Sequence, residues 1–238
     1  MLKAILFDLD GTLVPMDQRI FVEDYVRRMA EYMAPHGYSF DEINGVMWKG
    51  TEEMIKNDGS KTNYDVFWDT AKSFLGQRAV DDIPKFDSFY VSEFDKVKKV
   101  CGYEPEAAET VRKLRNDGFK IILATNPIFP DMATRWRINW LGMSPEEFDL
   151  YTTYENCCFA KPNPKYFEDI LNKFGLKPEE CLMVGNDTRD DMVTEKMGMK
   201  VFLRTNYLIH REDYDINIYP NGDFKELLEY VAELKNEA

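Results

Sequence analysis

The sequence has 238 residues, 44% of them hydrophobic and 31% charged, a composition that argues against wholesale disorder and a length that suits one large or two smaller domains. Its 43 acidic and 30 basic residues give a net charge of −13, which disfavours nucleic-acid phosphates and anionic membranes as partners. Four cysteines without CxxC spacing and only two histidines argue against a Cys/His zinc site and for reduced thiols.

The first predicted element is a buried strand over residues 4–7, the apolar run AILF. The segment before Asp8 is too short for a secretory signal, and no apolar run approaches the length of a membrane span. We therefore expect a cytoplasmic protein. The strand runs directly into Asp8 and Asp10, where burial makes charge costly. Gly11 follows and lets the backbone turn close to a ligand.

Residues 15–100 contain no strand-like run, and their apolar residues recur at helical spacing. Ser39 and Glu42 form the pattern of a capping box at the start of one helix. We expect a helical insert between the first strand and the rest of the core. Its aromatic residues are expected to pack inside the insert rather than against a cofactor, and Trp48 is expected to be a core residue.

Strand-like runs return after the insert and alternate with helical patterns. Continuous apolar residues predict strands at 121–124, 181–184 and 201–203, and a weaker pattern predicts another within 148–154. Runs without polar alternation are typical of parallel strands that are covered on both faces. These segments therefore predict the inner strands of a parallel sheet.

Three helices are predicted between and after these strands. One begins at Pro105 and ends at Gly118, and one runs from Asn163 to Gly175. A third starts at a capping-box pattern over 223–226. This order predicts an α/β fold with a doubly wound parallel sheet, in which ligands bind beyond the carboxyl ends of the strands. Residues 1–14 and 101–238 form the predicted core domain and 15–100 a helical domain.

Polar residues follow the predicted strands at the edge where the carboxyl ends of parallel strands meet. They are Asp8 and Asp10, Thr125 and Asn126, and Asn186, Asp187 and Asp191, with Lys161 before a helix. Carboxylates this crowded repel one another unless a cation intervenes. Magnesium prefers oxygen ligands and is held by one or two carboxylates, waters and a phosphate. The set therefore predicts a site for Mg²⁺ and a phosphate group.

Asp8 and Asp10 suit phosphoryl transfer. A carboxylate can attack phosphorus and form an aspartyl-phosphate. The metal and Lys161 would offset the repulsion, and the Thr125 hydroxyl would hold phosphoryl oxygens. A second carboxyl group would protonate the leaving alkoxide and later take a proton from water. Because the two acids are two residues apart, both side chains can leave the strand end on the same side.

The motifs DLDGT, LATN, AKPNP and MVGNDTRDDM, in this order, resemble those of the haloacid dehalogenase superfamily over essentially the whole chain. The resemblance implies a nucleophile at Asp8, a general acid/base at Asp10 and phosphate contacts from Thr125 and Lys161. We expect the neighbouring residues of these motifs to contribute to substrate binding, namely Gly11, Thr12 and Asn126. The helical insert resembles the cap domain that closes over the site in many members.

The resemblance also implies metal binding by Asp8, the main-chain carbonyl of Asp10 and an acid of the fourth motif. When the fourth motif is aligned with the family pattern by the end of its strand, Asn186 occupies the position of the metal-binding acid. When the alignment is shifted by one residue, Asp187 occupies that position. We expect Asp187 to bind the metal because a carboxylate holds magnesium more tightly than an amide. Asp191 is expected to support it.

The expected function is a magnesium-dependent phosphatase that hydrolyses a small-molecule phosphate monoester through an aspartyl-phosphate intermediate. The resemblance favours phosphate esters because members that dehalogenate or cleave phosphonates differ at the position of Asp10. One alternative is a phosphomutase acting on a sugar phosphate, and another is a non-enzymatic phospho-aspartate signalling or phosphate-binding protein. The natural substrate and the oligomeric state are not readable from the sequence, which is compatible with a monomer.

Three basic residues stay outside the predicted site. Arg135 and Arg137 follow the second motif and are expected on an exposed helix face. His210 is expected at the surface, in a loop over 204–222 that leaves a strand end near the site.

Overall fold

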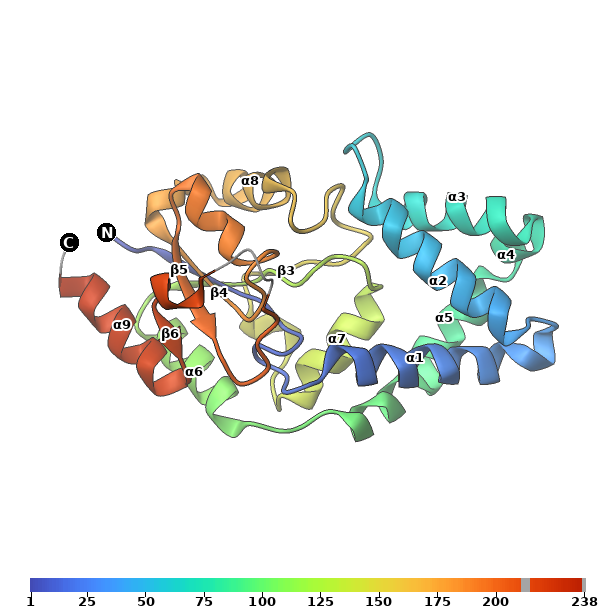
Figure 1. Ribbon diagram of the computed structural model, residues 1–238, viewed down its shortest axis with the longest axis horizontal. Coiled ribbons are helices and arrows are strands. Elements are labelled where there is room, and N and C mark those ends of the chain that lie inside the picture. The colour runs from blue at the N-terminus through green and yellow to red at the C-terminus, as the bar shows by residue number, and fades with distance from the viewer. Residues whose placement is uncertain (211–214, 237–238) are drawn as a thin grey trace.

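The computed structural model describes residues 1–210 and 215–236, which form an α/β core and a helical unit at opposite ends of the long axis (Figure 1). Within the described residues there is a six-stranded sheet, ordered β3-β2-β1-β4-β5-β6 and parallel throughout. Its strands are β1 (Ala4–Phe7), β2 (Lys120–Leu123), β3 (Leu150–Tyr151), β4 (Cys181–Gly185), β5 (Lys200–Arg204) and β6 (Asn221–Gly222). The predicted doubly wound parallel sheet is confirmed.

The edges of the sheet differ most from the sequence prediction. Strand β3 occupies only two residues of the segment 148–154. The sequence does not predict β6, because Asn221 and Gly222 are neither apolar nor strand-forming. Its pairing with β5 at the sheet edge holds it in place. Sequence patterns therefore locate the inner strands better than the outer ones.

Helices connect the strands of the core. They are α6 (Pro105–Asn116), α7 (Asp131–Trp140), α8 (Pro164–Phe174) and α9 (Phe224–Asn236), with the 3₁₀ helices η3 (Pro145–Glu147), η4 (Pro178–Glu180), η5 (Met192–Met197) and η6 (Ile216–Ile218). The residues predicted to start and end α8 do so in the structure. The Asn163 side chain caps its N-terminus, and Gly175 ends it with φ +61°. At the start of α9, the Asp223 N–H donates to Glu226 at 2.7 Å and the Glu226 N–H donates to Asp223 at 3.2 Å.

Both faces of the sheet are covered, which explains the continuous apolar runs of its strands. Ile5 and Phe7 of β1 belong to an apolar cluster with buried residues of α6, α7 and α9. Ala4 and Leu6, which point the other way, belong to a second cluster with α8 and η5. No residue of β1 therefore faces water, and each must be apolar.

The register of the central strands brings three loops together. Phe7, the last residue of β1, pairs with Leu123 at the end of β2 and with Val184 near the end of β4. The segments that begin at Asp8, Ala124 and Gly185 therefore leave the sheet side by side at its carboxyl edge.

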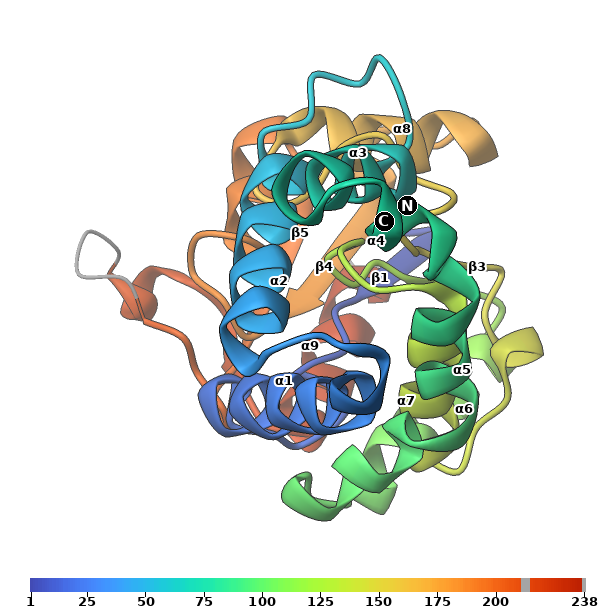
Figure 2. The ribbon, with the colours of Figure 1, turned by 90° about the vertical axis from the view of Figure 1, so that its right-hand side faces the viewer.

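The helical unit lies between β1 and α6. It contains α1 (Gln18–Met33), η1 (Ala34–His36), α2 (Phe40–Ile55), α3 (Asn63–Leu75), α4 (Gln77–Asp81), α5 (Ile83–Ser92) and η2 (Phe94–Val100). Figure 2 looks from this end and shows α1 below α2 and α3, with α5 across from them. The predicted capping box is present at α2, where the Glu42 N–H donates to Ser39 at 3.2 Å and the Ser39 N–H donates to Glu42 at 2.9 Å.

The expectation that Trp48 is a core residue is wrong. Its side chain is 60% exposed on α2, and its indole N–H donates to Asn44 at 3.1 Å, one helical turn earlier. Helical spacing predicts that a residue lies on the apolar face of a helix, but it does not predict whether a neighbouring element covers that residue.

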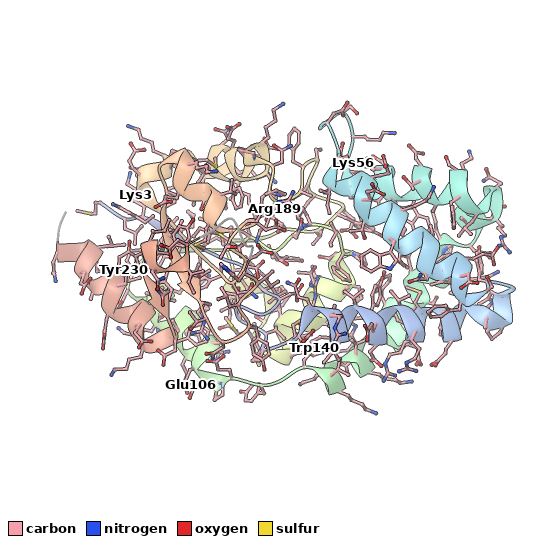
Figure 3. All side chains as sticks on the ribbon, viewed as in Figure 1. Lys3, Lys56, Glu106, Trp140, Arg189 and Tyr230 are labelled. Atoms are coloured by element: carbon pink, nitrogen blue, oxygen red, sulfur yellow. The ribbon has the colours of Figure 1, made fainter. Side chains whose placement is uncertain are left out.

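The chain passes from the core into the helical unit and back again at a single junction. The Gly102 N–H donates to the Pro15 carbonyl at 2.7 Å, which pairs the outgoing and incoming segments. Trp140 of α7, labelled in Figure 3, lies at this junction, and its indole N–H donates to Asp95 of η2 at 2.7 Å. The four cysteines, all in the described part, are free thiols. No helix among the described residues has both the length and the apolar character needed to cross a bilayer.

Candidate active site

A polar pocket of about 150 Å³ lies at the carboxyl ends of β1, β2 and β4. Most of the site residues predicted from the sequence line this pocket, namely Asp8, Asp10, Thr125, Asn126, Lys161, Asn186, Asp187 and Asp191. Gln18, Phe21 and Val22 of α1 form part of its wall, so the helical unit contributes to the pocket. Four distant segments of the chain thus meet at the edge where the fold class predicts a ligand.

A buried ammonium group stands between two carboxylates at the base of the pocket. Lys161 Nζ lies 2.8 Å from Asp8 Oδ1 and 2.6 Å from Asp191 Oδ1. Lys161 and Asp191 are each only 1% exposed. Burial lowers the pKa of a lysine, but attraction to Asp191 and Asp8 outweighs it and raises the pKa of Lys161. Lys161 is therefore a fixed positive charge beside Asp8.

The turn after β1 is tied to the fourth motif. Gly11 has φ +86°, and a Cβ at this position would collide with the Asn186 side chain. The Thr12 hydroxyl lies 3.1 Å from Asp8 Oδ2 and 3.1 Å from Asn186 Oδ1, and it can donate to either. Neither Gly11 nor Thr12 lines the polar pocket. The Thr12 hydroxyl orients Asp8, and substrate binding by Gly11 and Thr12 remains a prediction.

Thr125 and Asn126 follow β2 and have different surroundings. The Thr125 carbonyl accepts hydrogen bonds from the hydroxyls of Thr152 at 2.7 Å and Tyr166 at 2.9 Å, which fix the turn. The Asn126 side chain accepts the main-chain N–H of Lys161 at 3.2 Å. Asn126 therefore positions the segment that carries Lys161, while the Thr125 side chain borders the pocket.

The fourth motif folds back on itself after β4. Asp187 Oδ1 accepts the N–H groups of Arg189 at 2.8 Å and Asp190 at 3.1 Å, and Asp191 Oδ2 accepts the Asp187 N–H at 3.0 Å. The Asn186 amide makes two contacts. Its oxygen lies 3.1 Å from the Thr12 hydroxyl, and its NH₂ group donates to the Tyr207 carbonyl at 2.6 Å. The loop after β5 thus reaches this motif. His210 in that loop is exposed, as expected, and residues 211–214 lie outside the described residues.

The expectation that Arg137 lies on an exposed helix face is wrong. Arg137 is fully buried, and its guanidinium forms an ion pair with Asp10 Oδ2. The same group stacks over the Phe129 ring at 4.4 Å and donates to Thr134 at 3.1 Å. One signal was present in the sequence: Arg137 follows Ala133 by one helical turn and so shares its buried face.

Burial and the ion pair with Arg137 affect the pKa of Asp10 in opposite directions. Burial raises the pKa of Asp10, although Arg137 opposes this effect. Asp10 Oδ1 is buried and has no hydrogen-bond partner among the described residues. A carboxyl group held at one oxygen, with its other oxygen unpaired, is suited to exchange a proton with a ligand in the pocket.

The oxygen donors of the pocket fit a single magnesium ion. Within the described residues, no three acidic, histidine or cysteine side chains cluster tightly enough to hold a metal unaided. Magnesium needs only one or two carboxylates when waters and a substrate phosphate complete its shell. Asp8 and Asp187 border the pocket and can supply these. Asp191 accepts from Lys161 and from the Asp187 N–H, so it holds in place the loop that carries Asp187.

Replacing Arg137 by Met is expected to lower kcat by about 10- to 100-fold with little change in KM, because Asp10 loses the group that orients it. Steady-state assays with an aryl phosphate, after circular dichroism has confirmed folding, measure this. Arg135→Met is the matched control, since half-buried Arg135 pairs with Asp131 on the same helix and does not line the polar pocket. Equal kcat for the folded Arg137→Met variant and the wild type would contradict a role for Arg137.

Comparison with known proteins agrees with this geometry. Glyceraldehyde 3-phosphate phosphatase of Methanocaldococcus jannaschii is 30% identical over 245 residues, covering 100% of both chains. Pyrophosphatase PpaX of Halalkalibacterium halodurans is 27% identical over 213 residues, covering 90% of this chain and 87% of its own. The crystal structure of β-phosphoglucomutase from Clostridium difficile shares the fold, with a TM-score of 0.58 and 19% identity over 100% of this chain and 98% of that one.

A sequence model of haloacid dehalogenase-like hydrolases matches residues 2–194, which include all four motifs. The relatives named as phosphatases agree with the expected phosphate-ester hydrolysis. With Asp8, Thr125, Lys161 and the fourth motif gathered at one sheet edge, the chain belongs to the haloacid dehalogenase-like hydrolase family.

Proposed function

We propose that the protein is a magnesium-dependent phosphatase that hydrolyses a small-molecule phosphate monoester through a phosphoryl group carried on Asp8. The observation that carries this proposal is the buried Lys161 ammonium, 2.8 Å from Asp8 Oδ1 in a pocket lined by further acids and Thr125. A lysine there can neutralise an incoming phosphoryl group and let two anions approach. The similarity to proteins named as phosphatases supports the same reaction.

The residues suggest a two-step reaction. Asp8 attacks phosphorus, the bond from phosphorus to the ester oxygen breaks, and Asp10 gives its proton to the leaving alkoxide. Asp10 then takes a proton from water, which attacks the phosphoryl group, and the bond to Asp8 breaks to release phosphate. Lys161 and Thr125 hold the phosphoryl oxygens in both steps. Burial, which raises the pKa of Asp10, favours its protonated form as the reaction begins.

Asp8, Asp187 and the main-chain carbonyl of Asp10 are the groups proposed to hold Mg²⁺, with Asn186 as the alternative to Asp187. The Asp10 carbonyl also accepts a hydrogen bond from Gln18 of α1 at 3.2 Å, so it lies at the junction with the helical unit. When bound, the ion would offset negative charge on the carboxylates and the phosphoryl group.

Asp187→Asn is expected to raise the Mg²⁺ concentration for half-maximal activity by about 10- to 100-fold, because the amide keeps an acceptor oxygen but loses the charge. Asn186→Ala is expected to change this concentration less. Magnesium titrations of initial rate compare the two variants. The reverse order, with Asn186→Ala the more magnesium-dependent, would assign the metal position to Asn186.

We further propose that residues 15–100 act as a cap on a core made of 1–14 and 101–238. Three residues of α1 already border the polar pocket, so movement of this helix would change access to Asp8. A cytoplasmic location and a monomeric state remain predictions.

A phosphate-release screen over sugar, nucleotide and metabolite monophosphates with Mg²⁺ tests the proposed function. Free phosphate indicates a phosphatase. Isomerised sugar phosphate without net release would indicate the phosphomutase, whose chemistry begins in the same way. A stable phosphoprotein without turnover would indicate a signalling role. No phosphate release from any ester by the folded protein would contradict the proposal.

A further inference from the structure

A second, larger cavity adjoins the polar pocket. It measures about 490 Å³, within the size range of sites for small organic ligands, and lies between the helical unit and the loop after β2. Gln18, Val22, Ile128 and Phe129 line both the cavity and the polar pocket. A molecule whose phosphate lies next to Asp8 can therefore extend past these four side chains into the cavity.

The wall of this cavity is aromatic. Of its seventeen lining residues, all within the described part of the chain, eight are aromatic, and only Arg19 and Glu23 carry a charge. Both charged residues are exposed. The hydroxyls of Tyr25 and Tyr90 hydrogen-bond to each other at 2.5 Å, and the Tyr25 hydroxyl also lies 3.5 Å from the sulfur of Met47. The two hydroxyls thus have partners within the protein, and the wall that remains is mainly apolar.

This chemistry suits an aromatic group better than a sugar or a second phosphate. A polyol carries more hydroxyls than the few polar groups of this wall can pair with, and unpaired hydroxyls cost binding free energy. A second phosphate would have one exposed arginine to pair with. A ring, in contrast, can stack on Phe129 or pack edge-on against the tryptophans. A three-carbon ester would leave most of the volume unfilled.

Given the proposed phosphatase function, we infer that the substrate is a phosphate monoester of a bulky alcohol that carries an aromatic ring. The phosphate lies between Lys161 and Thr125, and the ring occupies the apolar cavity between α1, α2 and Phe129. The helical unit selects for this ring. This substrate class differs from the glyceraldehyde 3-phosphate and pyrophosphate in the names of the two relatives.

Two alkyl esters test the inference, because their leaving oxygens have similar basicity. We expect the KM for 2-(2-naphthyl)ethyl phosphate to be at least about tenfold lower than that for glycerol 3-phosphate. Calorimetry of both esters with the Asp8→Asn variant measures binding without turnover and should show the same order. Equal or tighter binding of glycerol 3-phosphate would overturn the inference.

Replacements on α2 distinguish binding of the ring in the cavity from binding of the phosphate in the polar pocket. Thr51→Trp would fill the cavity, and Trp48→Ala would remove part of its wall. Each variant should therefore raise the KM for the naphthyl ester at least about fivefold. The kcat/KM for glycerol 3-phosphate should fall by a smaller factor than that for the naphthyl ester, since neither residue lines the polar pocket. Phe40→Ala is the control, because Phe40 is a 53% exposed residue of the same helix that does not line the cavity.

The outcomes distinguish this inference from the proposed function. An unchanged KM for the naphthyl ester in both Thr51→Trp and Trp48→Ala would overturn the aromatic subsite while leaving the phosphatase intact. Phosphate release from neither ester, together with tight binding of the naphthyl ester to Asp8→Asn, would instead contradict the catalytic proposal and support the subsite.

Discussion

Asp8→Asn is expected to lower kcat by at least about a thousandfold, the largest effect of any single replacement in this protein. An amide oxygen is a poor nucleophile toward phosphorus. The change keeps the shape of the side chain and leaves its amide oxygen as an acceptor for Lys161, which still pairs with Asp191, while the amide NH₂ can donate to the Thr12 hydroxyl. The loss should therefore appear in kcat, with no decrease in the free energy of unfolding.

Phosphate release from an aryl phosphate with Mg²⁺, together with urea unfolding, measures both quantities. Asp169→Asn is the matched control because it removes one exposed acid on α8, outside the polar pocket. Its kcat should equal that of the wild type. A kcat for folded Asp8→Asn within tenfold of the wild type would mean that another group attacks phosphorus.

Lys161→Met is expected to have the second largest effect, and it should reduce both stability and activity. The variant leaves the buried carboxylates of Asp8 and Asp191 facing each other without a cation. Breaking a buried ion pair at one partner costs about 3–5 kcal/mol of unfolding free energy. The same change removes the positive charge proposed to receive the phosphoryl group, so kcat should fall by at least about a hundredfold.

Urea unfolding without divalent cations measures the stability of this variant. Lys165→Met is the control, since Lys165 is an exposed lysine a few residues along the chain, and its change should stay within about 0.5 kcal/mol. Equal unfolding free energies for Lys161→Met and Lys165→Met would show that Lys161 does not compensate the two acids.

Much of the site was predictable because its position follows from strand topology. Apolar runs such as AILF identify the inner strands, and parallel strands bring their carboxyl ends to one edge. Asp8, Thr125 and Asn186 each follow such a run, so their proximity does not depend on details of packing. Lys161 precedes a helix instead of following a strand, and the resemblance of its motif to a known family supports its place in the site.

Contacts that depend on packing were not predictable. Arg137 carries a charge, which favours solvent unless an acid lies nearby, and only the folded chain shows that α7 turns it toward Asp10. Trp48 shows the opposite error, because it borders an open cavity instead of a packed core and stays 60% exposed. The aromatic residues of the insert were expected to pack together. Several do, but their spacing does not show that the packing leaves a cavity beside Phe129.

Asp8 is proposed to carry the phosphoryl group, and trapping this phosphorylated enzyme is the strictest test of that role. In Asp10→Asn, an aryl phosphate can still phosphorylate the enzyme because its leaving group needs no proton, whereas water lacks a base for the second step. Acid quenching followed by peptide mass spectrometry should find one phosphoryl group on the peptide that contains Asp8, and none when Asp8 is also replaced by Asn. A phosphoryl group on another residue, or turnover by the wild type with Asp8 never modified, would show that Asp8 is not the nucleophile.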